Sequence, residues 1–283
     1  MIANIFYDMP HRTEWEVPPL SEIESSELQR IFNQKYSYIG KGAQSYVFGS
    51  EDGKYVIKFF KYKHLKPSWL VQNLPGIGPI KTYKEKVTAR KQQKLDSVFG
   101  GYHLAYEVHK KESGLLYIHL NRGSDLNTKV TIIDKLGFER EVDLDSVNFI
   151  VQERVDTSRK AIYTALLEGN IQQAKTYVNS LLNLYLSEYA KGIYDYDHGV
   201  LHNTGFVGER PVHLDVGKLY RDENIHKPEY AQKDLAFVIA KISKRISERF
   251  PALHQELGDS MHAFVNEMFE QPSDHLLESC YYR

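Results

Sequence analysis

Residues 192–219, which read GIYDYDHGVLHNTGFVGERPVHLDVGKL, contain two polar clusters, and each cluster ends an apolar run. The first cluster is 195–198 (DYDH), and Asn203 follows it closely. The second cluster is 215–217 (DVG), directly after the apolar-rich run 212–214 (VHL). Asp and Asn side chains carry the hard oxygen ligands that suit Mg²⁺, so both clusters are candidate metal ligands.

A hairpin is expected to bring the two clusters together. Its predicted parts are short strands at 200–201, 206–207 and 212–214 and a turn at 208–211 (GERP). This pairing places Asn203 and Asp215 at the same end of a small sheet, close to Asp197. A further carboxylate near a metal site can orient a hydroxyl nucleophile. The alternative is a turn-rich loop whose Asp and Asn side chains cap backbone groups, and this stretch alone leaves both interpretations open.

The composition is that of an ordinary globular protein. Of its 283 residues, 42% are hydrophobic and 26% are charged, which is enough for one large core or for two lobes. The formal net charge of −1 gives no overall field that favours nucleic acid or a membrane. The single cysteine, Cys280, excludes internal disulfides and zinc clusters made of several cysteines.

The sequence shows neither a signal-peptide pattern nor an apolar run of membrane-spanning length. We therefore expect a cytoplasmic protein without a membrane span, and secretion by a non-classical route stays open. No nucleic-acid partner is expected.

Residues 36–61 (YSYIGKGAQSYVFGSEDGKYVIKFFK) predict a small meander of strands. The expected strands are 37–39, 46–50 and 54–60, with a hairpin turn at Asp52-Gly53. Between the first two strands, Gly40 and Gly42 flank Lys41, and the small residues Ala43 and Ser45 follow. Such a loop can close over phosphate groups, because no bulky Cβ keeps its amide groups away.

Lys58 lies between Ile57 and Phe59 on the third of these strands, with its side chain on the opposite face from theirs. A lone lysine in an apolar strand is usually a solvent-facing residue, and a lone Gly-x-Gly is weak evidence of a phosphate site.

Taken together, these patterns resemble the protein-kinase-like superfamily. The run 40–47 followed by 56–58 (VIK) is similar to the family's glycine-rich loop and phosphate-pairing lysine, with Ser45 where the third glycine usually stands. The Asp-Val-Gly at 215–217 resembles the family's Asp-Phe-Gly, and Asn203 precedes it at close to the usual interval. The order along the chain is that of the family, and the resemblance extends over roughly residues 36–245.

The resemblance implies a two-lobed α+β fold, with an antiparallel sheet in the N-lobe and a small, mainly helical C-lobe. The implied division is an N-terminal extension at 1–35 with a short helix, an N-lobe with glycine-rich loop and hinge at 36–155, and a C-lobe at 156–283. The remaining predicted strands are 102–108, 115–120, 129–133, 137–142 and 147–152. The predicted helices are 21–34, 82–98, 158–167, 171–191, one that begins at Asp234, and 252–269.

The nucleotide-binding residues follow from the resemblance. It implies that Gly40, Gly42, Ser45 and Val47 cover the phosphates of ATP and that Lys58 neutralises their charge. The backbones of Glu153 and Val155 would meet the adenine edge, with Gln152 at the rear of the pocket. The candidate for the family's lysine-pairing glutamate is Glu85, in the helix at 82–98; as an alternative, Glu85 balances neighbouring lysines on the surface.

Asn203 and Asp215 would hold Mg²⁺ against the phosphates, as the resemblance implies. The family's catalytic aspartate usually lies five residues before the asparagine, but His198 stands at that position here. We favour Asp197 as the residue that orients the acceptor hydroxyl, while Asp195, or no base at all, stays open. For His198 and His202 we expect packing rather than metal binding, because no third soft ligand has suitable spacing.

Residues 218–233 indicate which kind of acceptor the resemblance supports. They contain no Ser or Thr and no Ala-Pro-Glu-like close, so peptide docking and loop phosphorylation lack support. Asp234 resembles the family's buried aspartate that ties the catalytic loop to a helix. The alternative is an acid that caps the start of a helix, which would be expected at the same position. The short segment 218–233 and the small C-lobe are typical of the atypical branch of the family, such as small-molecule and lipopolysaccharide-type kinases.

The leading hypothesis is an atypical phosphotransferase that uses ATP and Mg²⁺ on an unknown small-molecule or protein acceptor. A second hypothesis is a pseudokinase that binds nucleotide or acts as a scaffold, which the irregular spacing between Asp197 and Asn203 motivates. A third is nucleotidyl transfer from ATP to a protein in the same pocket.

Overall fold

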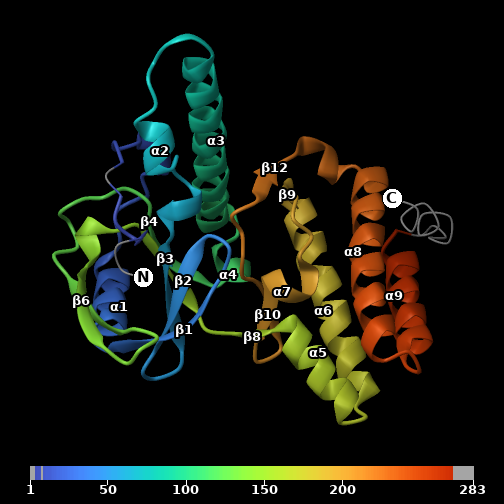
Figure 1. Ribbon diagram of the computed structural model, residues 1–283. Coiled ribbons are helices and arrows are strands. Elements are labelled where there is room, and N and C mark those ends of the chain that lie inside the picture. The colour runs from blue at the N-terminus through green and yellow to red at the C-terminus, as the bar shows by residue number, and fades with distance from the viewer. Residues whose placement is uncertain (1–3, 8, 270–283) are drawn as a thin grey trace. The chain divides into compact units, whose positions relative to one another are not determined.

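The chain has a mixed α+β fold (Figure 1) in a computed structural model that describes residues 4–7 and 9–269. It divides into two compact units. The first, here called the sheet unit, comprises Met1–Lys110 and Leu115–Arg154, and the second, the helical unit, comprises Lys111–Gly114 and Val155–Arg283. Each has its own hydrophobic core and is described by itself.

The sheet unit is built on seven strands in the order β4-β7-β3-β2-β1-β5-β6. The strands are β1 (Lys35–Lys41), β2 (Ser45–Ser50), β3 (Tyr55–Phe60), β4 (Leu115–His119), β5 (Lys129–Ile133), β6 (Glu139–Asp143) and β7 (Phe149–Glu153). Neighbouring strands are antiparallel except β1 and β5, which run parallel. The predicted meander β1–β2–β3 is confirmed, and the parallel pair makes the sheet mixed rather than purely antiparallel.

One face of this sheet is covered by α1 (Glu22–Phe32). The helix begins at a capping box, in which the Ser21 hydroxyl accepts from the amide of Glu24 and the Glu24 carboxylate accepts from the amide of Ser21. Leu28, Ile31 and Phe32 are buried in the core with side chains of the sheet. The second half of α1 is therefore packed into the sheet unit's core through these three side chains, while its other residues are exposed.

The longest helix is α3 (Gly78–Val108), which follows the short α2 (Trp69–Gln72). The strand predicted at 102–108 is wrong, because Phe99, Tyr102 and Tyr106 recur at helical spacing and are buried along one side of α3. The rings of Phe99 and Tyr102 lie 4.7 Å and 5.5 Å from that of Phe60 in β3. Packing against the sheet thus extends the helix well beyond the predicted 82–98. After α3 comes the single turn α4 (Lys110–Ser113).

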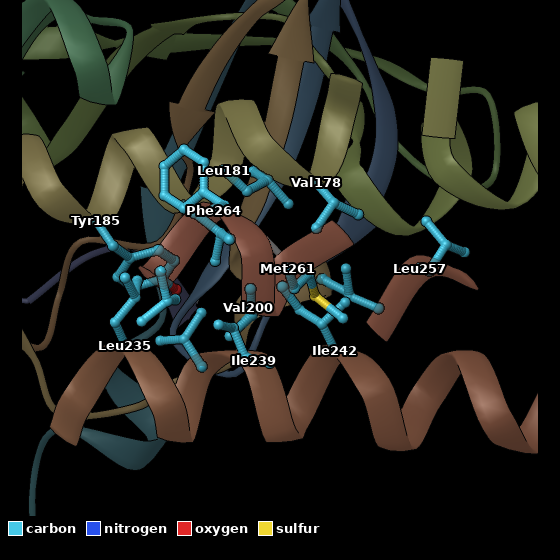
Figure 2. Packing of buried hydrophobic residues seen from close by; sticks show 14 of the residues in the cluster. Val178, Leu181, Tyr185, Val200, Leu235, Ile239, Ile242, Leu257, Met261 and Phe264 are labelled. Carbon is cyan, nitrogen blue, oxygen red and sulfur yellow. The ribbon is translucent and has the colours of Figure 1, made fainter. Parts of the chain in front are cut away.

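The helical unit consists of α5 (Ser158–Leu167), α6 (Ile171–Ala190), α8 (Pro228–Arg249) and α9 (His254–Phe269), with the short α7 (Val200–Asn203) between them. Figure 2 shows side chains of α6, α8 and α9 meeting in its core, where Leu181, Leu235 and Met261 are fully buried. Two small sheets complete the unit: β8 (Asp156–Thr157), β10 (Thr204–Val207) and β11 (Arg210–His213) form one, and β9 (Ile193–Asp195) and β12 (Leu219–Arg221) form the other. Short 3-10 turns lie at Thr13–Trp15, Tyr62–His64, Leu144–Ser146 and Glu223–His226.

Two predicted boundaries in the helical unit are corrected. Residues 200–201 form a helical turn rather than a strand, because the amides of His202 and Asn203 both donate to the carbonyl of Gly199. Helix α8 begins at Pro228 and not at Asp234, since proline lacks the amide hydrogen that the first helical position leaves unpaired in any case. The helix predicted at 171–191 is confirmed as α6, which ends at Ala190, and Gly192 follows it with a positive φ of 65°.

The sequence predicts fraying at 270–283, and these residues lie outside the described part of the chain. Among the helices that the structure describes, none combines the length and the apolar character that crossing a bilayer requires.

Candidate functional site

The pairing of β9 with β12 brings the two polar clusters of the helical unit together. Asp195, the last residue of β9, lies opposite Leu219 in β12. One residue further on, the amide of Tyr196 donates to the carbonyl of Lys218 over 3.2 Å. The first cluster therefore begins beside the two residues that directly follow the second, and this contact was not part of the sequence prediction.

The hairpin predicted from the sequence is present as β10 and β11, which pair from Thr204 opposite His213 to their two-residue turn. At its open end the carbonyl of Asn203 accepts from the amides of Leu214 and Asp215, over 2.5 Å and 3.3 Å. Asn203 and Asp215 are thus held side by side through the backbone, as the hairpin prediction required.

The side chain of Asn203 is folded over Gly199. A Cβ at position 199 would lie only 2.4 Å from Nδ2 of Asn203 and 2.9 Å from its Oδ1. No alanine could stand there unless the amide group moved, since real Cβ contacts are not that short. The absence of a Cβ at Gly199 therefore leaves the space that the side chain of this predicted metal ligand occupies.

Asp195 and Asp197 differ sharply in their surroundings. The Asp195 carboxylate is buried and accepts from the amides of Asp197 and His198, over 2.9 Å and 3.1 Å. Its burial raises the pKa of Asp195, although His213 and the Asp197 amide act in the opposite direction. The Asp197 side chain is 42% exposed and pairs with Nζ of Lys218 at 3.1 Å. The Asp195 carboxylate therefore holds the backbone of the loop, whereas the Asp197 carboxylate is accessible to solvent.

His198 anchors the loop to two helices. Its Nε2 donates to Oδ1 of Asp234 in α8 over 2.7 Å, and the other oxygen of Asp234 accepts from the Tyr189 hydroxyl of α6 over 2.6 Å. Burial lowers the pKa of His198, but the hydrogen bond and charge of Asp234 outweigh it and the net shift is upward. Packing was the expected role of this histidine. His202, by contrast, is exposed.

A second buried histidine lies beneath the cluster. Nδ1 of His213 donates to Glu188 over 2.7 Å, its Nε2 lies 3.6 Å from Asp195, and all three side chains are almost fully buried. Burial alone lowers the pKa of His213, but Glu188 and Asp195 together raise it to about 9. Sequence reasoning missed this triad, although Glu188 is an acid on the otherwise apolar face of helix 171–190.

In the sheet unit, three predicted nucleotide-binding residues lie in one row across adjacent strands. Gly40 of β1 is opposite Val47 of β2, and Val47 is opposite Lys58 of β3. Residues directly opposite each other present their side chains on the same face, so Val47 and Lys58 share a face. Lys58 is half-buried and continues the row to Ile150 in β7.

The glycine-rich loop is a closed turn. The amide of Gly42 donates to the carbonyl of Ser45 over 3.0 Å, and Lys61 contacts the Gly42 carbonyl. A Cβ on Gly40 would meet no atom within 4 Å, and one on Gly42 would meet only the Ser45 hydroxyl, at 3.7 Å. Packing within the described residues therefore does not require either glycine, and the backbone there is open to an approaching ligand.

The structure does not bring Glu85 to Lys58. Glu85 is 65% exposed, lies 3.9 Å from Lys81 of its own helix, and precedes Phe99, the residue that packs on β3, by about 21 Å of helix at 1.5 Å per residue. Sequence reasoning chose it as the better placed of two acids between Lys58 and the Gly100 position. The predicted helix, 82–98, omitted the residues up to Val108, so its packing on the sheet was placed too close to Glu85.

The predicted hinge residues lie where one unit ends and the next begins. Glu153 is the last residue of β7 and pairs with Tyr55, and the following amide of Arg154 donates to the carbonyl of Lys54 over 2.8 Å. Val155 belongs to the helical unit. There it packs on Gly205 of β10, where an added Cβ would lie 2.6 Å from it.

No protein-family model and no curated protein matches this sequence. Among solved structures, the chain is similar to WbdD in co-crystals with the kinase inhibitor LY294002, with a TM-score of 0.40 and 13% identity over 85% of this chain and 47% of that one. A second structure, described as the bifunctional kinase-methyltransferase WbdD, gives a TM-score of 0.38 and 12% identity over 84% and 47% of the two chains. This chain therefore spans just under half of the length of the WbdD chains that it resembles.

Proposed function

We propose that this protein is a phosphotransferase of the atypical kinase-like type, which uses Mg²⁺ and ATP to phosphorylate an acceptor hydroxyl. Two backbone contacts in the helical unit carry the proposal: the β9–β12 pairing joins the loop of Asp197 to the segment that follows Asp215, and the β10–β11 hairpin joins Asn203 to Asp215. Asp and Asn are the residue types that phosphoryl transfer needs for orienting a nucleophile and holding a metal ion.

The donor set of Asn203 and Asp215 fits Mg²⁺. Both side chains offer oxygen ligands, and their backbones are joined by hydrogen bonds at the open end of the hairpin. Over residues 4–7 and 9–269 there is no group of three His, Cys, Asp or Glu side chains that would hold a metal ion alone. This suits an ion that takes part of its coordination from nucleotide phosphates. When bound, Mg²⁺ would neutralise phosphate charge.

Asp197 is proposed to accept the hydrogen bond of the acceptor hydroxyl and then its proton. The acceptor oxygen forms the new bond to the terminal phosphorus, and the bond between that phosphorus and the bridging oxygen of ADP breaks. Lys218, 3.1 Å from Asp197, holds the carboxylate in place and adds positive charge beside the transferred group. This lysine directly follows the Asp-Val-Gly and was not singled out from the sequence.

In the sheet unit, the open backbone at Gly40 and the shared face of Val47 and Lys58 support binding of the nucleotide. The open space at Gly40 lets a phosphate approach the backbone without meeting a Cβ, and an ammonium group in the same row neutralises its charge. The hinge backbone at Glu153 and Val155 is proposed to meet the adenine. Glu85 has no role in this proposal.

The test is turnover of ATP by the purified chain, with and without Mg²⁺, together with the thermal midpoint in the same solutions. Asp215→Ala is expected to abolish both turnover and the midpoint increase that Mg²⁺ and ATP cause. The matched control is Glu209→Gln, an exposed acid in the turn of the same hairpin, which should leave both unchanged.

The same experiment separates the other hypotheses. A midpoint increase without turnover, lost in Asp215→Ala, would support a nucleotide-binding pseudokinase. Mass spectrometry of any modified protein tells a phosphoryl adduct from a nucleotidyl adduct. No midpoint change and no turnover would contradict the nucleotide site altogether.

A further inference from the structure

Residues 66–94 form a projecting segment of the sheet unit, here called the arm. The arm contains α2 and the first half of α3, and none of its residues is buried, whereas its neighbours Leu65 and Leu95 both are. Figure 1 shows this half of α3 reaching beyond the strands, with α2 beside it. More than half of α3 thus lacks the tertiary packing that normally stabilises a helix in water.

The arm nevertheless has a defined shape. Nζ of Lys84 in α3 donates to the carbonyls of Gln72 and Leu74, over 2.7 Å and 3.2 Å, and so fastens α2 to α3. The Ser68 hydroxyl caps α2 by accepting from the amide of Val71. A structured and unburied helical pair presents a surface to a partner.

The charge of the arm is opposite to that of the rest of the chain. Its charged residues are seven cations, Lys66, Lys81, Lys84, Lys86, Arg90, Lys91 and Lys94, and one acid, Glu85. The whole protein has a formal net charge of −1, so the remaining residues are net acidic. The arm is therefore a local basic surface on a protein without overall basic character, and the partner that complements it is anionic.

Large apolar side chains are exposed on the same segment. Trp69 is 72% exposed, and the other members of this set are Leu70, Ile77, Ile80 and Tyr83. Ile80 and Tyr83 are three residues apart and so lie on one side of α3. A binding site for phosphate groups alone needs no aliphatic side chains. Lysines together with exposed Trp, Tyr, Leu and Ile are the composition of elements that lie in a membrane interface.

We propose that the arm binds the surface of an anionic lipid bilayer. Its lysines contact the headgroups, and Trp69, Leu70 and Ile77 enter the boundary between headgroups and acyl chains. The inference is independent of the phosphotransferase proposal, because it uses no residue of that site.

The test uses the full chain and sedimentation with two kinds of vesicles, phosphatidylcholine alone and phosphatidylcholine with about 30% phosphatidylserine. We expect at least tenfold stronger binding to the anionic vesicles, and weaker binding as salt is raised, because salt screens the headgroup charge. Equal binding to both kinds of vesicle, or to neither, would overturn the proposal.

The two tryptophans give a second and independent measurement. Trp15 is 4% exposed and already in an apolar environment, whereas Trp69 is 72% exposed. A blue shift of the fluorescence on addition of anionic vesicles, and quenching by brominated acyl chains, would therefore come from Trp69. Trp69→Phe should remove the shift while the protein still binds. An unchanged spectrum in the presence of bound vesicles would contradict insertion of the arm.

Variants separate the arm from the rest of the surface. The triple variants Trp69→Ser/Leu70→Ser/Ile77→Ser and Lys81→Gln/Lys86→Gln/Arg90→Gln should each lower vesicle binding at least tenfold. Their thermal midpoints should stay unchanged, because no altered residue is buried. The matched controls are Leu136→Ser/Phe138→Ser, exposed between β5 and β6, and Lys233→Gln/Lys241→Gln/Lys244→Gln on α8, and neither should affect binding.

Two other partners are outcomes of the same experiments. Tight binding of an oligonucleotide that displaces the protein from vesicles, with no loss in the apolar triple variant, would show a nucleic-acid surface and overturn the lipid proposal. A concentration-dependent dimer that the apolar variant disrupts, without vesicle binding, would show that a second copy covers the arm.

Discussion

Gly199 is the residue on which the geometry of the proposed metal site depends most directly. The Asn203 amide group fills the space beside Gly199 that a side chain would need. A Cβ at position 199 would lie only 2.4 Å from Nδ2 of Asn203. The φ of −75° at Gly199 is negative, so the position does not require the left-handed conformation that favours glycine. The atoms that an added Cβ would meet first are those of the Asn203 side chain, so a substitution here acts on the proposed ligand.

Gly199→Ala is predicted to weaken Mg²⁺ binding in the presence of ATP by about tenfold, as substitutions that misplace a ligand commonly do. The measurement is the Mg²⁺ concentration needed for half of the thermal midpoint increase at fixed ATP. Gly258→Ala is the control, because a Cβ at that position in α9 meets no atom within 4 Å. A Gly199→Ala protein that responds to Mg²⁺ like the unaltered chain would contradict the assigned role of Asn203.

The two acids of the first cluster are predicted to fail in different ways. Asp197→Asn should keep the thermal midpoint but lower turnover by roughly 10²–10⁴-fold, since a positioned acid–base group contributes that much. Asp195→Asn should lower the unfolding free energy by about 1–3 kcal/mol, because its amide group cannot accept both backbone hydrogen bonds. Turnover and thermal unfolding of both variants are compared at one pH. The reverse pattern would make Asp195 the base.

Two buried histidines predict how stability changes with pH. The folded-state pKa of His213 is about 9 and that of His198 is also raised, whereas an unfolded histidine titrates near ~6.5. Their contribution to stability is therefore fully present below pH ~6.5 and is lost as the pH rises through the folded-state values. We expect the thermal midpoint to fall between pH ~6.5 and about 9.

His198→Asn is the variant that tests this dependence. Asparagine tolerates the positive φ of 47° at that position but carries no charge at any pH in the range. The fall of the midpoint with rising pH should become shallower, while His11→Gln, at an exposed site in the sheet unit, should leave it unchanged. A midpoint that rises over this pH range would contradict the charged state of both histidines.

At the scale of elements, hairpins and amphipathic helices were predictable and the ends of long helices were not. The β1–β2–β3 meander was predictable from its turn residues and α6 from its apolar periodicity, because both signals lie within a short stretch of sequence. The stretch 102–108 contains two tyrosines and a valine, which favour a strand, but it is helical and Tyr102 packs on Phe60. The error over α3 also explains why Glu85 was chosen as the partner of Lys58.

In the strand pair β8 and β10, the backbone of β8 leaves no room for a side chain at Gly205 of β10. Gly205 lies opposite Thr157, and an added Cβ would be 2.4 Å from the carbonyl oxygen of Asp156. Gly205→Ala is therefore predicted to lower the unfolding free energy by about 1–3 kcal/mol, because the strands would have to move apart. Urea unfolding measures the change, with Gly258→Ala again as the control. An unaltered midpoint would mean that β8 can shift without cost.

At the scale of the whole molecule, the candidate site was predictable in part because its residues are close in sequence. Asn203 and Asp215 are joined by one hairpin, so the pattern of turns predicted their contact. The pair of His213 with Glu188 and that of His198 with Asp234 join segments 25 and 36 residues apart. Such contacts depend on how helices pack, which periodicity in one segment does not specify.

The presence of a separate core in each unit predicts two unfolding transitions. Leu181 is fully buried in the helical unit between α6, α8 and α9 (Figure 2), and its truncation to alanine should cost about 2–5 kcal/mol there. Both tryptophans, Trp15 and Trp69, belong to the sheet unit. Tryptophan fluorescence therefore follows the sheet unit, while far-ultraviolet circular dichroism follows the helices of both.

Leu181→Ala should move the part of the circular-dichroism transition that belongs to the helical unit to lower urea concentration. The fluorescence midpoint, which reports on the sheet unit, should stay unchanged. Phe59→Ala, in the core of the sheet unit, is the reciprocal variant and should move the fluorescence midpoint instead. If either variant shifts both signals equally, the two cores unfold as one cooperative system. In that case, a ligand that binds one unit would raise the unfolding free energy of both units by the same amount.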